Sequence, residues 1–295
     1  MKADTPSTTA RLIAAALILA AREPCLSHLV SDTTAGWCEW FLSQSWRDRL
    51  LARSARYWPG RRLWKAVERI ALPGAIDHWV TRKAWIEARV RALPPEACRQ
   101  TIILGAGLDP LGVRLASEQR PRWVVELDHP STQRLKLAAL AQCPHRPNIT
   151  LIPCDLTVEL PDWRALASTG LIDPTADATV IAEGLLMYFT EARVRKILLS
   201  IADLPCPHLR LLFTCMSVGD GNVAQFERQS SAIGKWLARQ HEPFQWGTSI
   251  ERVNSLLRST GWRCELISDI ADLDIRSVPD DCKLRGEMIV DAVRI

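Results

Sequence analysis

The sequence of 295 residues contains no apolar run long enough to cross a lipid bilayer as a helix. A short apolar stretch, residues 12–21, follows two basic residues and resembles a signal peptide at first sight. It continues into Arg22, Glu23 and Pro24, however, without a small-residue cleavage site. We therefore expect a buried alanine-rich helix at this position, in a cytoplasmic protein that does not engage membranes.

Metal-binding and disulfide patterns are missing as well. The nine cysteines are an odd number and include no Cys-x-x-Cys pair, whereas zinc sites and disulfide frameworks need close or even spacing. The six histidines show no metal-ligand spacing either. These absences predict reduced thiols in core positions and no metal centre. The cysteines are Cys25, Cys38, Cys98, Cys143, Cys154, Cys206, Cys215, Cys264 and Cys282.

A strongly basic stripe of the kind that binds nucleic acid is also lacking. Residues 1–100 hold 16 Lys and Arg against 9 Asp and Glu, or +7, and the remainder holds 21 against 24, or −3. The basic residues alternate with apolar ones at helical spacing, which is typical of a solvated helix face and predicts no nucleic-acid partner. An entrance for an anionic substrate is the alternative.

What the sequence does contain is a change, near residue 99, in the spacing at which apolar residues recur. Residues 1–95 follow helical spacing, and seven of the twelve tryptophans lie between Trp37 and Trp85. These tryptophans are expected to pack between the helical layer and the following sheet. The alternative is that some of them line an apolar substrate pocket. From residue 99 onward, short β-rich apolar runs alternate with helical patterns, which indicates a doubly wound parallel sheet.

The expected fold class is therefore α/β, with a Rossmann-like sheet of about seven strands, the last antiparallel. We expect an N-terminal helical cap at 1–95 and a nucleoside-binding domain at 96–295. The apolar runs are 99–105, 122–128, 149–155, 178–184 and 209–215, followed by 262–268 and 286–295. The helical patterns after the first strand include 131–141, 191–202, 223–240 and 248–260.

Glycine or acidic residues follow the first four expected strands. Gly105 and Gly107 come after the first strand and would let a ligand touch the backbone. Asp128, Asp155 and Glu183 end the next three. Because ligands bind outside the carboxyl ends of parallel strands, these residues predict one binding rim, with Asp128 placed to accept hydrogen bonds from a ribose diol.

The glycine loop argues against a dinucleotide. A dinucleotide fingerprint needs a third glycine where this chain has Pro110, and proline removes an amide that a pyrophosphate could use. The neighbouring Asp109 disfavours a diphosphate and favours a cation. These features favour S-adenosylmethionine, which carries an ammonium and a sulfonium and no phosphate.

Several motifs resemble those of a known family: LGAGLDPLGVRL, VVELDHPSTQRLKLAAL, CDL and AEGLLMYF. Together they are similar to the leucine carboxyl methyltransferase family of class I S-adenosylmethionine-dependent methyltransferases, which includes relatives acting on polyketides and other small-molecule acids. The resemblance runs from about residue 82 to residue 200 and returns in EPFQWGTS and GEMIVDAV. Residues 23–75 match nothing that we can name.

The resemblance implies a role for each matching residue. Arg82 would hold the methionine carboxylate of the cofactor, and Gly105 would lie against its methionine portion. Asp128 would bind the ribose hydroxyls, while Asp155 and Leu156 would frame the adenine.

Glu183 would contact the polar methionine end of the cofactor, and Tyr188 would point toward the methyl-transfer region. The family usually has Thr-Arg where this chain has Pro110 and Leu111, and a second family arginine is retained as Arg114.

Structural roles remain open for the same residues. Asp128 and Asp155 are also suited to cap helices, Arg82 to a helix surface and Tyr188 to the core. Glu183 in an apolar strand is harder to explain in this way, because burying an unpaired charge is costly. His129 is interpreted as a helix-start residue, with a catalytic role as the alternative.

The acceptor is expected to be a carboxylate. A carboxylate is already ionised at neutral pH and needs no general base, whereas a phenol benefits from one, and no His–Asp pair is evident at the rim. The sequence thus predicts an O-methyltransferase that esterifies a small-molecule or peptide acid. The alternatives are a phenol or hydroxyl O-methyltransferase, an NAD-dependent oxidoreductase and a non-catalytic S-adenosylmethionine-binding protein.

Overall fold

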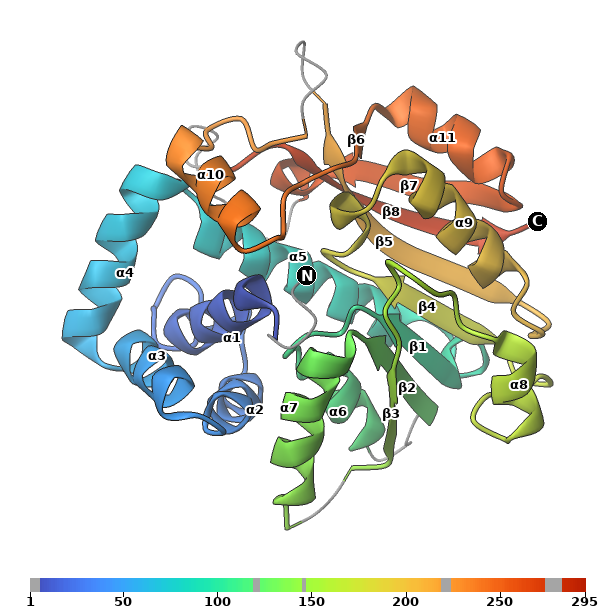
Figure 1. Cartoon of the computed structure of the whole chain (residues 1–295), viewed down its shortest axis with the longest axis horizontal. Coiled ribbons are helices and arrows are strands. Elements are labelled where there is room, and N and C mark those ends of the chain that lie inside the picture. Colours follow the sequence, from blue (N-terminus) through green and yellow to red (C-terminus); the bar gives the residue numbers. More distant parts are fainter. Residues whose placement is uncertain (1–5, 119–122, 145–146, 219–223, 274–282) are drawn as a thin grey trace.

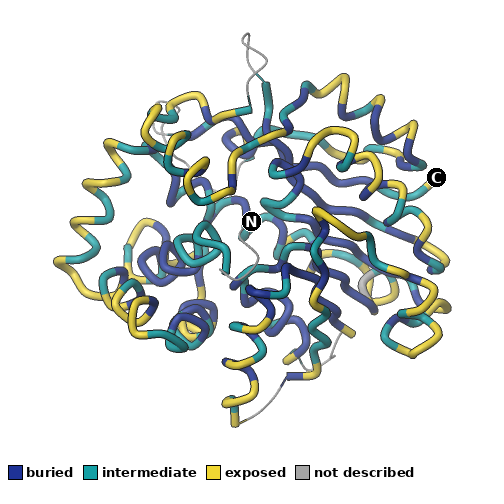
Figure 2. Tube along the Cα trace, viewed as in Figure 1, coloured by how far each residue is buried: buried dark blue, intermediate teal, exposed yellow. Residues whose placement is uncertain are grey.

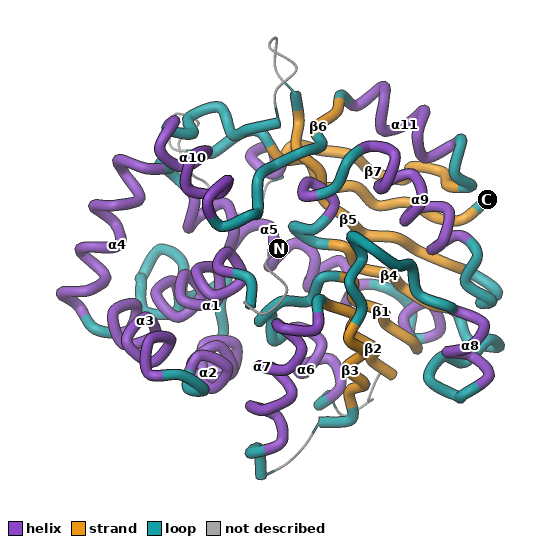
Figure 3. The backbone as a smooth tube through the Cα atoms, viewed as in Figure 1, coloured by secondary structure: helices purple, strands orange, loops and turns teal. Residues whose placement is uncertain are grey.

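The computed structural model describes residues 6–118, 123–144, 147–218, 224–273 and 283–295. A group of helices precedes the sheet in the chain. The group places its first four helices beside the sheet, on the left in Figures 1 and 3, and its fifth against one face of the sheet. Its members are α1 (Thr8–Ala20), α2 (Asp32–Leu42), α3 (Trp46–Arg56), α4 (Trp58–Ala71) and α5 (Ala75–Ala92). The expected helical character is confirmed for residues 6–95, residues 1–5 lying outside the described ranges, while the division into two domains at residue 95 stays a prediction.

The sheet has the order β3-β2-β1-β4-β5-β8-β7 among the described residues, with a two-residue strand β6 paired to β5. The strands β1 to β5 are parallel, and β8 runs antiparallel between β5 and β7. This arrangement confirms the predicted fold class. The bounds are β1 (Gln100–Leu104), β2 (Trp123–Asp128), β3 (Ile149–Pro153), β4 (Ala178–Ala182), β5 (Leu209–Ser217), β6 (Gly247–Thr248), β7 (Trp262–Asp269) and β8 (Glu287–Arg294).

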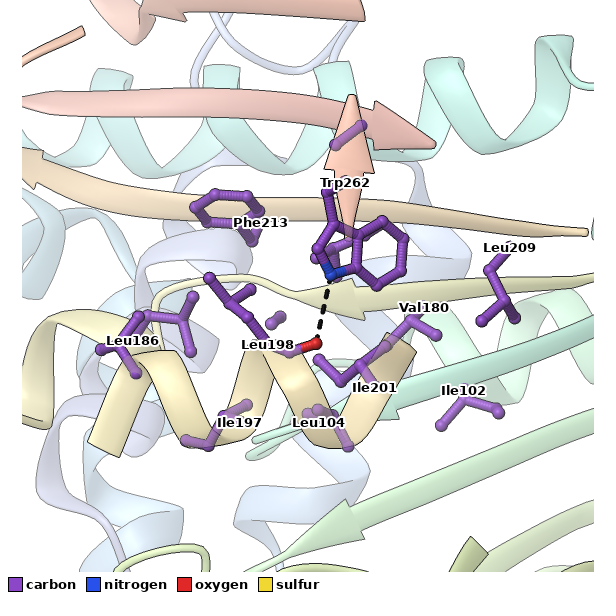
Figure 4. Close-up of a cluster of buried hydrophobic side chains, with 14 of the residues drawn as sticks. Ile102, Leu104, Val180, Leu186, Ile197, Leu198, Ile201, Leu209, Phe213 and Trp262 are labelled. Atoms are coloured by element: carbon purple, nitrogen blue, oxygen red, sulfur yellow. Dashed lines mark hydrogen bonds between the residues drawn. The ribbon is translucent and has the colours of Figure 1, made fainter. Parts of the chain in front are cut away.

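Helices cover both faces of the sheet because the strands are apolar on both sides. Ile102 and Leu104 pack on one face with residues of α8, α9 and α11, whereas Ile103 packs on the other with α5 and α6. On the first face, the buried indole of Trp262 donates to the carbonyl oxygen of Leu198 at 3.1 Å (Figure 4). The helices are α6 (Leu111–Ala116), α7 (Pro130–Ala141), α8 (Trp163–Ser168), α9 (Glu191–Ala202), α10 (Ser231–Arg239) and α11 (Ile250–Arg258).

The first helix is buried, as its alanine-rich sequence predicts. Ser7 caps α1 by accepting from the amide of Ala10, and residues 14–20 are all buried. The helix packs with α2 and α3 in a buried cluster that also includes Ala139 and Leu140 of α7. In the described part of the chain, every helix is too short or too polar to traverse a membrane.

Two expectations need correction. The helix expected at 223–240 begins only at Ser231, because residues before it form a turn in which Phe226 is buried against His78; residue 223 itself lies outside the described residues. Core placement is wrong for Cys25, which is exposed, although Cys38, Cys154, Cys206 and Cys215 are buried. The Cys98 side chain, His145 and Cys282 lie outside the described residues.

Candidate functional site

The carboxyl ends of β1 to β4 open onto one cavity of about 170 Å³, which α1 and residues 241–245 border from the other side. The structure brings to this cavity all the residues that the sequence singled out for the rim. They are Arg82, Gly105, Gly107, Asp128, Asp155, Leu156, Glu183 and Tyr188. The topology explains this gathering, because parallel neighbouring strands end at the same edge.

The glycine loop after β1 needs its glycines for two reasons. Gly105 and Gly107 have φ angles of 66° and 55°, in the left-handed region that side chains disfavour. A Cβ atom at Gly105 would also lie 2.6 Å from the side chain of Leu185, and one at Gly107 would lie 3.1 Å from Ala10. The loop is therefore squeezed between α1 and the segment after β4, with its backbone at the cavity.

Asp128 ties the end of β2 to this loop. Its Oδ2 accepts from the amide of Gly107, and its Oδ1 accepts from the amide of His129 at 2.6 Å. Burial raises the pKa of the Asp128 carboxyl, although these two amide bonds oppose the rise. The carboxylate lines the cavity and retains lone pairs for further donors, as a ribose diol would require.

Asp155 stands at the end of β3 and organises its own turn. Its Oδ1 accepts from the amide and hydroxyl of Thr157 at 2.9 and 2.6 Å. Partial burial raises the pKa of the Asp155 carboxyl, but the bonds from Thr157 outweigh this and hold the pKa below its usual value. The other oxygen lies 3.7 Å from Nε2 of His129, which caps α7 as expected. The expectation that the rim holds no His–Asp pair is therefore wrong, because both residues line the cavity.

A row of alternating charges closes the side of the cavity formed by α5. Nε of Arg82 donates to Glu183 at 2.9 Å, and Lys83 lies 3.0 Å from the same Glu183 oxygen and 2.6 Å from Asp109. The pKa of Lys83 is raised and that of Asp109 is lowered; burial opposes both shifts, and the attraction between the two charges outweighs it. Asp109 therefore meets the cavity as half of an ion pair.

This pairing changes how the loop acts on a ligand. From sequence, Asp109 favours a cation through its free charge, but Lys83 and the amide of Leu111 already satisfy it. Arg114 pairs with Glu87 and is absent from the residues that line the cavity. The negative charge available to a ligand comes instead from Asp128 and Asp155, because Glu183 is itself paired with Arg82 and Lys83.

Glu287 and His78 extend the row and were missed by sequence reasoning. Both oxygens of Glu287 accept from Nη1 of Arg82, at 2.9 and 2.8 Å, and one also bonds Nε2 of His78 at 2.8 Å. Burial alone raises the pKa of Glu287, yet Arg82 and His78 lower it to about 2. The sequence did contain a signal for Glu287, because this glutamate lies inside the apolar run 286–295. Burying an unpaired charge is costly, so Glu287, like Glu183, needs a partner.

A second cavity of about 190 Å³ adjoins the first. Tyr188, in the short 3-10 helix Leu186–Tyr188, borders both, as do Arg82 and Gly184. Its walls are mostly aromatic and aliphatic, and include Trp64, Trp79, Met187, Phe226, Ile233, Trp236, Leu237 and Phe244. Two of the seven clustered tryptophans thus line a cavity, whereas Trp46 and Trp58 are exposed.

The described residues contain no group of three His, Cys, Asp or Glu side chains placed to hold a metal ion. The arrangement is instead one polar cavity at the strand ends, with cations at one end and carboxylates along the rim, joined to an apolar one. Such a pair of cavities suits two ligands that meet at Tyr188.

Comparison with known proteins gives a family match. The model of the family described as leucine carboxyl methyltransferase matches residues 10–202 of this chain. This range includes most of α1, the glycine loop and the first four strand ends. It also covers residues 23–75, in which the sequence motifs had indicated no match.

Individual relatives are similar over part of their length. A protein of Mycolicibacterium paratuberculosis named "Putative S-adenosyl-L-methionine-dependent methyltransferase" is 29% identical over 164 residues, which cover 55% of this chain and 50% of the relative. A protein of the same name from Mycobacterium bovis BCG is 30% identical over 173 residues, covering 56% and 55%. The chain thus spans about half the length of these curated relatives.

Solved structures share the fold at low sequence identity. The crystal structure of a protein described as a "putative methyltransferase" from Thermobifida fusca superposes with a TM-score of 0.59 and 15% identity, covering 99% of this chain and 96% of that one. A DUF574 family protein from Streptomyces avermitilis gives a TM-score of 0.55 at 16% identity, covering 81% and 92%.

Proposed function

This chain belongs to the leucine carboxyl methyltransferase family of S-adenosyl-L-methionine-dependent methyltransferases, and from that membership we propose that it methylates a carboxylate oxygen of a small apolar acid. The observation that supports the proposal best is the meeting of the two cavities. The polar cavity at the strand ends would take the cofactor, and the aromatic cavity beyond Tyr188 would take the acceptor.

The polar cavity fits the cofactor by its donor and acceptor groups. The backbone of the left-handed glycine loop lines the cavity at Gly105 and Gly107, where a ligand would contact it. Carboxylates of Asp128 and Asp155 suit a ribose diol and an exocyclic amine, with Leu156 beside the adenine. Arg82 and Glu183 together suit the carboxylate and ammonium of a methionine end.

S-Adenosylmethionine, when bound, supplies an electrophilic methyl group on a sulfonium. The protein must align the acceptor oxygen behind that methyl group and exclude water. Burial, reinforced by the nearby Glu242, raises the pKa of Tyr188, so the hydroxyl stays protonated at neutral pH and can donate. We place Tyr188 at the junction as the group that positions the acceptor oxygen.

The aromatic cavity offers little that could deprotonate an alcohol or phenol. Its carboxylates, among the described residues, are Glu68, which accepts from the amide of Ile76, and Glu287, which is held by Arg82 and His78. A carboxylate acceptor needs no base because it is already ionised.

The helical layer at 1–95 would act in this proposal as the cap that completes the acceptor site. α4 contributes Trp64 and Val67 to the aromatic cavity, and α5 contributes Trp79. The other walls come mostly from α10 and from loops near the strand ends, so the cap would share the control of acceptor specificity with α10.

Methyl transfer is tested by incubating the chain with methyl-labelled S-adenosylmethionine and matched aromatic acids, phenols and peptides. We expect label to enter an apolar acid and to be released by alkali, which hydrolyses esters. An alkali-stable product would point to a phenol or hydroxyl acceptor, and cofactor binding without transfer to any compound would contradict the proposed activity.

Substituting Val67 with tryptophan tests the acceptor cavity. Val67 lines this cavity but is 55% exposed, so a larger side chain should narrow the mouth without disturbing the core. We expect kcat/KM for the acceptor to fall roughly tenfold with an unchanged dissociation constant for S-adenosylmethionine. The matched control is Ala66→Trp, one residue earlier on the exposed surface and outside the cavity lining; equal effects of the two changes would refute the assignment.

A further inference from the structure

Helix α4 carries an apolar stripe that the described protein leaves uncovered. None of its residues is buried, and Leu63, Val67 and Ile70 are 65%, 55% and 81% exposed (Figure 2). Their spacing of four and three places them along one face of the helix. We call this stripe, with Tyr57 and Trp58 at its start and Arg62 and Arg69 beside it, the α4 surface.

Charge on the segment containing α3 and α4 is strongly positive. Residues 46–71 hold eight Lys and Arg against two Asp and Glu, or +6, so the remainder of the chain carries −2. Arg56, Arg61 and Lys65 are paired with Glu39 or Glu23. Within the described residues no ion pair engages the other arginines, which are Arg47, Arg49, Arg53, Arg62 and Arg69.

Exposed aromatic rings accompany this charge. Tyr57 and Trp58 are 61% and 60% exposed where α4 begins, and Trp46 is 60% exposed where α3 begins. The guanidinium of Arg62 lies 4.9 Å from the centre of the Trp58 ring. Rings that are apolar at one end and polar at the other, next to arginines, are enriched where proteins meet the headgroup region of a bilayer.

The apolar stripe and the positive charge together indicate which kind of partner fits the α4 surface. A second copy of the chain would place the same arginines against each other across a two-fold axis, where like charges repel. A nucleic acid would meet the arginines but leave the apolar stripe in water. We propose that the α4 surface docks this protein on an anionic lipid bilayer, with α4 lying in the plane of the interface.

The dimensions agree with that orientation. α4 has 14 residues, about 21 Å of helix, and its apolar and basic sides are separate, as in helices that lie on a membrane. Val67 belongs both to the exposed stripe and to the lining of the aromatic cavity. The docked surface would therefore lie beside the acceptor cavity, although lipid binding is independent of the proposed methyl transfer.

Vesicle flotation of the full chain tests the inference. We expect the protein to float with vesicles of phosphatidylglycerol and phosphatidylcholine, and not with phosphatidylcholine alone. Ile70→Glu should weaken the association about tenfold or more, because it replaces an apolar side chain that would be inserted. The paired change Arg62→Gln with Arg69→Gln should weaken it roughly ten- to thirtyfold, and added salt should act in the same direction.

The matched controls lie on α11, whose residues are outside the α4 surface. Ile250→Glu and the paired change Arg252→Gln with Arg258→Gln make the same substitutions at other exposed residues, and should leave flotation unchanged. Equal binding to neutral vesicles, equal losses in the α11 variants, or no flotation at all would overturn the proposal. A dimer in sedimentation that Ile70→Glu dissociates, without vesicle binding, would assign the surface to a second copy instead. Cofactor titration of the same variants checks folding and is unaffected by either outcome.

Discussion

Replacing Glu287 with glutamine is expected to lower the free energy of unfolding by roughly 3–5 kcal/mol, the usual cost of removing one partner from a buried ion pair. The Glu287 side chain is fully buried and accepts from both Arg82 and His78. Glutamine keeps the shape but removes the charge, which leaves Glu183 as the remaining carboxylate partner of Arg82 and takes from His78 the carboxylate that it contacts. Chemical denaturation measures the loss, and the melting temperature should fall by about 10 °C.

The same substitution should remove a pH dependence. The pKa of Glu287 is lowered from its ordinary value of 4.5 to about 2: burial opposes this shift, and the charge of Arg82 drives it. Because the folded pKa lies below the unfolded one, the ionised carboxylate stabilises the fold fully above about pH 4.5. That contribution is lost as the pH falls toward about 2, so the wild-type protein and Glu287→Gln should converge in stability over this range.

Glu265→Gln on the neighbouring strand β7 is the matched control. Glu265 pairs with Arg263 at 3.0 Å, but both side chains are exposed, and exposed pairs contribute about 1 kcal/mol or less. If the two substitutions cost the same, or if Glu287→Gln costs less than 1 kcal/mol, the buried row of charges does not hold α5 to β8 as described.

Asp128→Asn is expected to weaken binding of S-adenosylmethionine roughly 10- to 100-fold, the equivalent of one or two hydrogen bonds to a charged group. The carboxylate at the end of β2 already orders the loop by accepting from Gly107, and a ribose diol would add two donors to it. Titration calorimetry measures the change. Adenosine should also compete better than 2′,3′-dideoxyadenosine for the wild-type protein, and this preference should vanish in the variant.

A control must separate loss of the ribose contact from loss of loop order. Asp269 suits this purpose because it also accepts from two backbone amides, those of Ala271 and Gly286, and is absent from the lining of both cavities. Asp269→Asn should cost comparable stability and leave the dissociation constant for S-adenosylmethionine unchanged. Equal cofactor affinity in Asp128→Asn and the wild-type protein would contradict the ribose assignment.

Local pattern was enough to predict the fold class. The apolar runs 178–184 and 209–215 contain β4 and the larger part of β5, and the pattern at 191–202 corresponds to α9. Buried parallel strands must be apolar on both faces, so each strand can be recognised from the apolar run of its own residues. The helix expected at 223–240 was too long because its first residues are apolar for a different reason, the packing of Phe226 on His78.

The candidate rim was also predictable, since topology alone brings the ends of β1 to β4 together. What could not be predicted was the electrostatic state of its members. Asp109 follows the glycine loop as a seemingly free acid, yet Lys83 on α5 neutralises it. The two residues are 26 positions apart in the sequence, and their side chains meet only because α5 packs on the sheet.

The sequence by itself determined the order of strands and helices, the glycine loop and the acidic strand ends, because each depends on neighbouring residues and on the handedness of parallel connections. Only the tertiary structure decided which charges compensate each other and where the second cavity lies. Arg82 meets Glu287 across 205 residues, and the aromatic cavity draws its walls from α4, α5 and α10. Such contacts arise from packing between distant segments, and no local pattern encodes them.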